Sequence, residues 1–216
     1  MKIECRSMIG ENNRKLKREC QDSYSIQNSK GVTAVCVCDG AGFSNNSAIA
    51  ATEISRAVAK LMIEYYYKWN PDEVRIFISK YIDNELFILA NQYGVKYSEL
   101  ATTIMAVCLK DGEEINMLHL GDGNIFVKKA GEDKLYPLSS AQSGMIKNQT
   151  YLTGSDKTSS YIRTYTSFNN PVYEKIYMVT DGCGCDCECD EDKKLNCLLA
   201  DACTQKDDYT IVKIDV

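Results

Sequence analysis

The chain has 216 residues, 44% of them hydrophobic, with 3 prolines and 13 glycines. This composition predicts one globular domain over residues 1–216, and no apolar run approaches the ~20 residues of a membrane-spanning helix. A formal net charge of −5 argues against general nucleic-acid binding. The N-terminus carries no export signal, so we expect a cytoplasmic protein without membrane or nucleic-acid partners.

The first half of the chain predicts three strands followed by two helices. Short strands are expected at residues 2–8 and 22–28, and residues 32–38 are apolar throughout, as in a strand buried on both faces. From Ser44 to Tyr67, apolar residues recur at spacings of three and four, which predicts a helix with one buried face. The sequence Asn70-Pro71 then begins a second helix, because Pro suits the first helical turn.

The second half is rich in short strands. They are predicted near residues 101–109, 113–120, 124–130, 134–138, 161–167, 174–180 and 211–216, with a short helix near 191–203. The polar stretch 139–160 has no pattern that assigns it to either class. Runs of strands interrupted by two consecutive helices favour an α+β sandwich over alternating βαβ units.

Acidic residues recur where apolar strands end. Asp39, Asp122 and Asp181 are each followed by Gly at the end of such a strand, and Asp207-Asp208 precedes the last strand. Carboxylates placed there can converge on one point and bind a hard divalent cation. Asp-Gly is also a strong hairpin signal, and for Asp122, with strands on both sides, that interpretation suffices. It fails for Asp39 and Asp181, which no strand follows, so the sequence favours a metal site.

A basic run, Arg14, Lys15, Lys17 and Arg18, precedes Asp22. Such runs are usually solvated loops. Beside an acidic metal site, however, these cations can offset the charge of a phosphate group on a substrate.

Six short motifs occur in a fixed order along almost the whole chain. They are Cys20-Gln21-Asp22-Ser23, Val37-Cys38-Asp39-Gly40-Ala41-Gly42, Ala101-Thr102-Thr103, His119-Leu120-Gly121-Asp122-Gly123-Asn124, Thr180-Asp181-Gly182 and Asp207-Asp208-Tyr209-Thr210. In this order they resemble the motifs of the type 2C protein phosphatases, the metal-dependent Ser/Thr phosphatase family. Each motif alone is weak, whereas six in order are a strong indication.

The resemblance implies two packed antiparallel β-sheets flanked by α-helices, with a binuclear Mg²⁺ or Mn²⁺ site at one edge. The implied metal ligands are Asp22, Asp39, Gly40 through its carbonyl, Asp122, Asp181 and Asp207. Asp39 would bridge the two ions, and Asp181 and Asp207 would complete the shell of the first. These three are the implied catalytic residues. Asp22 would act near the second ion, and Asp122 would hold a third, weaker ion.

The implied activity is hydrolysis of phosphoserine and phosphothreonine in proteins. Two ions ~3.5–4 Å apart can activate a shared water and clamp an in-line attack on phosphorus, so no Ser or Cys nucleophile is needed. Carboxylate and carbonyl ligands suit Mg²⁺ or Mn²⁺ better than Zn²⁺. The implied partners are a phosphorylated protein substrate and a cognate Ser/Thr kinase in a bacterial signalling pathway.

Two departures from the family pattern keep an alternative open. Where the family usually has a phosphate-binding Arg, this chain has Lys17, followed by Arg18. Lys cannot form a bidentate fork, so phosphate binding is weaker, or Arg18 reaches in through a one-residue shift. Gln21 replaces the Glu of animal members. The alternative is a phosphatase-like binding or regulatory module without turnover.

The 11 cysteines are an odd number, which suggests reduced thiols rather than a disulfide framework. Four alternate directly after Gly182, namely Cys183, Cys185, Cys187 and Cys189. They are either a solvent-facing loop or a soft-metal or redox site, and the latter would make the chain a thiol-rich metal-binding protein on the same fold. The single histidine, His119, is expected to be a packed structural residue rather than a catalytic acid.

Overall fold

This computed structural model describes residues 1–110, 113–142, 150–154, 158–167, 173–183, 195–196, 199 and 205–216. The strands are β1 (Lys2–Met8), β2 (Asp22–Ser29), β3 (Val32–Asp39), β4 (Ile104–Lys110), β5 (Ile115–Leu120), β6 (Asn124–Lys129), β7 (Leu135–Ser139), β8 (Arg163–Ser167), β9 (Tyr173–Val179) and β10 (Tyr209–Asp215). The helices are α1 (Glu11–Lys15), α2 (Ser47–Tyr65), α3 (Pro71–Tyr93) and α4 (Thr158–Tyr161), with 3-10 turns η1 (Tyr66–Lys68) and η2 (Tyr97–Leu100).

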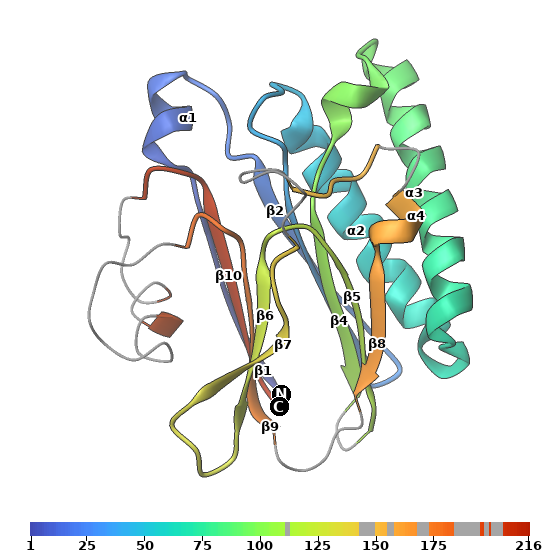
Figure 1. Ribbon diagram of the computed structural model, residues 1–216, viewed down its shortest axis with the longest axis vertical. Coiled ribbons are helices and arrows are strands. Elements are labelled where there is room, and N and C mark those ends of the chain that lie inside the picture. The colour runs from blue at the N-terminus through green and yellow to red at the C-terminus, as the bar shows by residue number, and fades with distance from the viewer. Residues whose placement is uncertain are drawn as a thin grey trace.

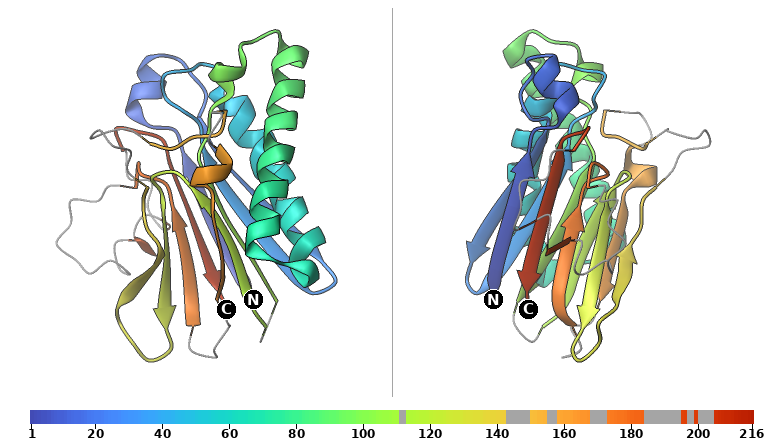
Figure 2. Two further views of the ribbon diagram at one scale, coloured as in Figure 1. Left: turned by 45° about the vertical axis from the view of Figure 1, so that its right-hand side comes forward. Right: turned by 90° about the vertical axis from the view of Figure 1, so that its left-hand side faces the viewer.

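The strands form two five-stranded antiparallel sheets packed face to face (Figure 1). One has the order β2-β3-β4-β5-β8, and the other has the order β1-β10-β9-β6-β7. Helices α2 and α3 cover the outer face of the first sheet (Figure 2). On the outer face of the second, Leu195 and Leu199 pack against Tyr177 and Ile211. The predicted α+β fold of two antiparallel sheets with helices is confirmed.

The apolar run of residues 32–38 is explained by the position of β3 in the fold. Its residues alternate between two separate cores: Val35 and Val37 face the second sheet, whereas Cys36 and Cys38 face α2. All four side chains are fully buried. A strand covered by a sheet on one face and a helix on the other needs apolar side chains at every position. The strand therefore carries a rigid backbone from the core to its last residue, Asp39.

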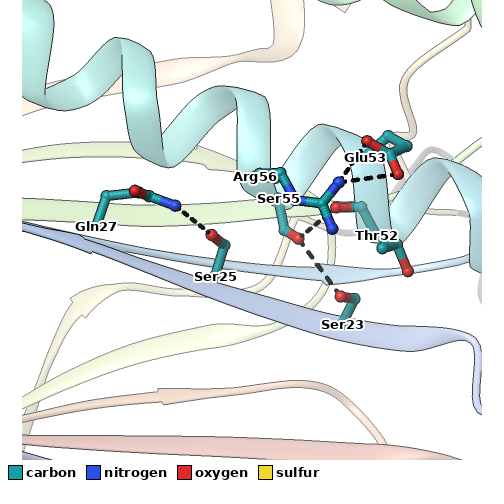
Figure 3. A network of polar contacts seen from close by, with 7 residues as sticks. All are labelled: Ser23, Ser25, Gln27, Thr52, Glu53, Ser55 and Arg56. Carbon is teal, nitrogen blue, oxygen red and sulfur yellow. Dashed lines mark hydrogen bonds and ion pairs between the residues drawn. The ribbon is translucent and has the colours of Figure 1, made fainter.

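The contact between β2 and α2 is polar, because β2 is the edge strand of its sheet. The Ser23 and Ser55 hydroxyls form a hydrogen bond of 3.4 Å across this contact. Figure 3 shows the two side chains pointing toward each other. Ser55 also donates to the Thr52 carbonyl at 3.0 Å, and Arg56 pairs with Glu53 on the outer side of the helix. At an edge that water can reach, such contacts satisfy polar groups that a core would leave unpaired.

The long helices begin and end close to their predicted limits. The Asn70 side chain accepts the backbone amides of Asp72 and Glu73, and α3 ends at Gly94, whose φ of 64° is left-handed. Helix α2 begins at Ser47, three residues after the predicted start. Among the described residues, no helix has the length and apolar character needed to cross a bilayer. Helix α1 and the 3-10 turns were not predicted, and the expected helix near 191–203 lies mostly outside the described residues.

The hairpin interpretation of Asp122 is wrong. The strands on either side of it, β5 and β6, belong to different sheets, so the turn carries the chain from one sheet to the other. Both edges of β5 are already paired, with β4 and β8, which leaves no edge for β6. The crossing requires Gly121, whose φ is +120°. At Gly123, a Cβ would lie 2.5 Å from the Met105 side chain.

Candidate metal centre

Three carboxylates from distant parts of the sequence meet at one edge of the sandwich. Asp39 ends β3, Asp122 lies in the turn between the sheets, and Asp181 follows β9. One oxygen of each lies within 4.8 Å of the other two. They line a cavity of about 390 Å³ together with Gly40 and Asp207. Five of the residues predicted from sequence therefore share one cavity.

The Ala101-Thr102-Thr103 motif holds the backbone of Asp39. The Asp39 carbonyl accepts the Thr103 amide and the Thr102 hydroxyl, each at 2.8 Å. The Asp39 amide donates to the Thr103 hydroxyl at 3.0 Å. With both backbone groups satisfied by one neighbouring segment, Asp39 presents its carboxylate from a position with little freedom.

Gly40 is required by close backbone packing. A Cβ at this position would lie 2.8 Å from the Ser47 carbonyl oxygen and 2.9 Å from that of Gln21. The Gly40 amide already donates to the Gln21 carbonyl at 3.0 Å. The chain next to Asp39 is therefore packed against the start of α2 and the start of β2, a close approach that only Gly permits, and Gly40 itself lines the cavity.

Asp22 is directly opposite Asp39 in the β2–β3 pair. Its side chain is buried, and one oxygen accepts the Thr180 hydroxyl at 2.9 Å. The other oxygen has no hydrogen-bond partner among the described residues. Burial raises the pKa of Asp22 to about 7. Asp22 thus lies beside Asp39 on the neighbouring strand and outside the group of three carboxylates.

The electrostatics of the cavity suit a cation. Burial raises the pKa of Asp39 well above its usual value, and the charges of Asp22 and Asp181 raise it further. The pKa of Asp181 is raised by burial and then by Asp122. Within the described part of the chain, no Lys or Arg forms an ion pair with Asp39, Asp122 or Asp181. Crowded carboxylates without a basic partner fit hard divalent ions such as Mg²⁺ or Mn²⁺.

Asp207 and Asp208 are adjacent but differ in environment. Asp207 is exposed and lines the cavity, whereas Asp208 is only 3% exposed. One oxygen of Asp208 accepts the Gly10 amide at 2.6 Å. The other accepts the Gln21 amide at 2.6 Å and the Asn13 side chain at 2.8 Å. Asp208 thereby connects Gly10, Asn13 and Gln21 to the start of β10 by hydrogen bonds. The sequence offered no signal for this role beyond a charged residue beside a strand.

The two residues predicted to bind phosphate lie at different distances from the acidic cavity. Arg18 donates to the carbonyl of Gly42, a residue of the cavity wall, at 3.1 Å. Arg18 also lines an adjoining hollow together with Asp207. Lys17 is exposed, with a left-handed φ of 56°, and lines a groove farther along α1 and α2. The structure brings Arg18, and not Lys17, to the mouth of the cavity.

The stretch that sequence patterns left unassigned also contributes to the site. The Thr150 hydroxyl donates to a carboxylate oxygen of Asp122. Leu152 lines the cavity, and the Thr153 amide donates to the Thr102 carbonyl at 2.9 Å. This segment thus docks on both Asp122 and the motif that holds Asp39. Scattered threonines in a polar stretch carry no sequence signal for such contacts.

His119 is fully buried, as predicted for a packed residue. Its Nδ1 atom lies 2.6 Å from the Ser139 hydroxyl and 3.2 Å from the Arg163 guanidinium. Burial, and then the charge of Arg163, lower the pKa of His119 to about 3. The imidazole is therefore neutral at physiological pH, and it belongs to the packing below the Asp122 turn.

Of the alternating cysteines, only Cys183 lies within the described residues, and Cys185, Cys187 and Cys189 lie outside them. The Cys183 thiol donates to the Thr210 carbonyl at 3.5 Å. Burial raises the pKa of Cys183 far above its usual value. A soft metal binds the thiolate, so this protonated, hydrogen-bonded thiol is poorly suited to be a ligand.

Fold and site together define an α+β sandwich with an acidic, cation-type site at one edge. The family model of protein phosphatase 2C matches residues 9–208. Because the match covers most of the 216 residues, the chain belongs to the protein phosphatase 2C family. None of the curated proteins compared with the chain matches it.

Solved structures with the same fold include several bacterial phosphatases. A bacterial serine phosphatase superposes with a TM-score of 0.68 at 16% identity, over 100% of this chain and 98% of that chain. Serine/threonine phosphatase Stp1 from Staphylococcus aureus gives 0.67 at 16% identity, over 100% and 95%. RsbX in complex with magnesium gives 0.60 at 17% identity, over 98% and 92%. At these identities the likeness establishes the fold.

Proposed function

We propose that the chain is a metal-dependent phosphoprotein phosphatase that hydrolyses phosphoserine and phosphothreonine. The observation that carries this proposal is the convergence of Asp39, Asp122 and Asp181 within 4.8 Å in a cavity without a basic partner among the described residues. Membership of the protein phosphatase 2C family supports a phosphatase reaction. The serine and serine/threonine specificity of the structural neighbours supports the substrate class.

The proposed metal ligands are Asp39, Asp181, Asp207 and the carbonyl of Gly40 for a binuclear site and Asp122 for a third ion, all of them residues of the cavity. Asp22, opposite Asp39 in the β2–β3 pair, is proposed to act near the second ion. Bound Mg²⁺ or Mn²⁺ would supply the positive charge that activates water and stabilises charge on the phosphoryl group. A structural neighbour crystallised with magnesium supports the choice of ion. The raised pKa values of Asp39 and Asp181 mean that protons compete with metal for both side chains.

The protein itself would position the phosphate. Arg18 lies at the mouth of the cavity, where its guanidinium can neutralise a phosphoryl oxygen. Of the described residues that line the cavity, none is a Ser or Cys, and the Thr103 hydroxyl is occupied by the Asp39 amide. The described lining therefore offers no Ser or Cys nucleophile, which supports attack by water over phosphorylation of such a side chain.

A binding module without turnover is the second candidate. It is favoured by Lys17, which is displaced from the cavity, and by Gln21, whose side-chain amide is used by Ser44 and Ser47 at the start of α2. The third candidate, a thiol-rich metal-binding protein, rests on cysteines of which only Cys183 is described. The intact carboxylate set favours the enzyme over both.

The test is hydrolysis of a phosphothreonine peptide by metal-stripped protein titrated with Mn²⁺, beside an Asp39→Ala control. We expect turnover that requires Mn²⁺ and is lost in the control. Folded wild-type protein that binds Mn²⁺ without turnover would favour the binding module. Tight Zn²⁺ binding, lost on replacing the four alternating cysteines with Ser and without turnover, would favour the thiol-rich protein.

A further inference from the structure

Two hollows continue from the acidic cavity along the end of α1. The nearer one is lined by Lys15, Leu16 and Arg18, and it shares Gly42 and Asp207 with the acidic cavity. The farther one, against the start of α2, shares Leu16 and Arg18 with the nearer. Together they form a continuous surface, which we call the α1 groove: Lys15–Arg18 with Asn45, Ala48 and Ile49.

The α1 groove is basic in a protein with a net charge of −5. Lys15 and Lys17 are exposed in the groove, and Arg18 is half-buried at the cavity mouth. Arg14 is exposed and precedes Lys15 in α1 without lining either hollow. Within the described residues, the ion pair recorded for these cations joins Lys15 to Glu11 at 3.2 Å, with both side chains well exposed. Exposed pairs of this kind are weak. The cations are therefore available to a ligand, although two acidic side chains also line the hollows, Glu19 in the farther one and Asp207 in the nearer one.

Apolar side chains lie among these charges. Leu16 is 60% exposed in the middle of the groove, and Phe43 is 73% exposed on the wall of the acidic cavity. A single exposed apolar residue is ordinary on a protein surface. Here, however, both occupy the path that leads away from the site of chemistry. An apolar side chain of a ligand would find contact area beside the cations.

The groove is held rigidly against the metal site. The Glu11 and Asn12 amides donate to the carbonyls of Gln205 and Lys206 at 2.9 and 3.0 Å. Asn13, in the same helix, is tied to the buried carboxylate of Asp208. Helix α1 is fixed directly to the segment that contains Asp207. The protein therefore loses little conformational entropy when a ligand binds across the groove and the cavity.

We propose that the α1 groove binds an acidic segment of the phosphoprotein substrate, on one side of the phosphorylated residue and with an apolar residue among its carboxylates. This proposal rests on the proposed phosphatase function. Charge complementarity selects the ligand, since the groove concentrates positive charge on an acidic protein.

The kinetic test uses phosphothreonine peptides of equal length with Mn²⁺-loaded protein. One carries acidic residues and a Leu on the N-terminal side, one carries them on the C-terminal side, and one has Gln in place of the acids. We expect kcat/KM to be about five- to tenfold higher for one acidic peptide than for the Gln peptide, and this preference to shrink at high salt. Equal kcat/KM for all three peptides would overturn the proposal.

Single substitutions test whether the groove causes the preference for the acidic peptide over the Gln peptide. Lys15→Glu should remove most of this preference, and Leu16→Gln should reduce it. Lys80→Glu makes the same charge change on the exposed face of α3 and should leave the preference intact. Leu16→Gln and Lys80→Glu should hydrolyse p-nitrophenyl phosphate, which is too small to reach the groove, at the wild-type rate. For Lys15→Glu the preference is measured as the ratio of kcat/KM for two peptides, so that any effect of this residue on phosphate binding cancels. An equal loss in the Lys80 variant would show a general charge effect and refute the assignment.

Direct binding separates this proposal from the phosphatase function. Fluorescence anisotropy with the labelled acidic peptide lacking phosphate reports on the groove even if the protein shows no turnover. We expect Lys15→Glu, and not Lys80→Glu, to weaken this binding several-fold. No difference between the acidic and Gln peptides would overturn the groove, whereas equal binding of a labelled DNA oligonucleotide would reassign it to polyanions. Loss of p-nitrophenyl phosphate hydrolysis with binding retained would reject the phosphatase alone.

Discussion

The backbone amide of Gln21 donates to the buried carboxylate of Asp208 at 2.6 Å, across 187 residues of sequence. The same carboxylate accepts the amide of Gly10 and the side chain of Asn13. The connection matters because Asp207, the next residue, lines the acidic cavity. One buried side chain thus fixes the α1 segment and the start of β2 in relation to the proposed metal ligands.

We expect Asp208→Ala to lower the free energy of unfolding by about 3 kcal/mol, because three buried donors lose their acceptor. Asp208→Asn should cost less, about 1–2 kcal/mol, because its amide oxygen keeps some of the bonds while its NH₂ group faces donors. Chemical unfolding measures both. Asp215→Asn, which removes a partly exposed ion pair with Lys213, is the control and should change stability by well under 1 kcal/mol. An unchanged free energy of unfolding in Asp208→Ala would refute the role of Asp208 in holding these segments together.

Replacing the central carboxylate should separate activity from stability. Asp39→Asn is expected to abolish turnover of p-nitrophenyl phosphate. It should also raise the melting temperature in EDTA, because it removes a buried charge that burial, Asp22 and Asp181 all disfavour. Thermal unfolding in EDTA and a steady-state assay with Mn²⁺ test both effects. Activity within tenfold of wild type would break the site assignment, and a lower melting temperature would contradict the electrostatic argument.

The contact between Thr150 and Asp122 predicts a graded effect. Asp122→Ala should retain activity at saturating Mn²⁺ but require a higher Mn²⁺ concentration, because the proposed first-ion ligands remain. Thr150→Val, which keeps the side-chain volume and removes the hydroxyl donor, should change the Mn²⁺ requirement through Asp122 alone. Titration of activity against Mn²⁺ measures both. If Thr150→Val changes activity equally in the presence and absence of Asp122, the two residues are not coupled.

The stability of the metal-free protein should depend on Asp22 as pH changes. With a pKa raised to about 7, Asp22 keeps a proton in the folded state that the unfolded chain releases near pH 4. Its contribution to stability is therefore present below about pH 4 and is lost as pH rises through about 7. Asp22→Asn should be more stable than wild type by about 1–3 kcal/mol at pH 8 and nearly equal at pH 4.

The comparison of wild type with Asp22→Asn is needed because His119 changes the stability of the folded state with pH in the opposite direction. Its pKa of about 3 means that the folded state rejects a proton that the unfolded chain binds, so its contribution rises with pH up to about 6.5. The difference between wild type and Asp22→Asn cancels this effect. Urea unfolding in EDTA between pH 4 and pH 8 provides the measurement. A pH-independent difference would mean that Asp22 is not protonated in the folded protein.

Much of the fold could be read from local patterns, because the periodicity of burial is written directly in the side chains. The continuous apolar run of β3 indicated burial on both faces, and the spacings in α2 and α3 located the long helices. The Asp122 turn shows where such patterns fail. Asp-Gly between two strands indicates a hairpin, but whether the strands pair depends on which edges are free, and β4 and β8 occupy those of β5.

The sequence by itself determined the chemical character of the site: three strand ends carrying Asp, a basic run before Asp22, and six motifs in a family's order. Only the tertiary structure decided which of these residues meet. It brought Asp39, Asp122 and Asp181 together, placed Arg18 nearer than Lys17, and buried Asp208 while exposing Asp207. Residue type is local information, whereas convergence depends on strand order and long-range backbone contacts, which no local pattern encodes.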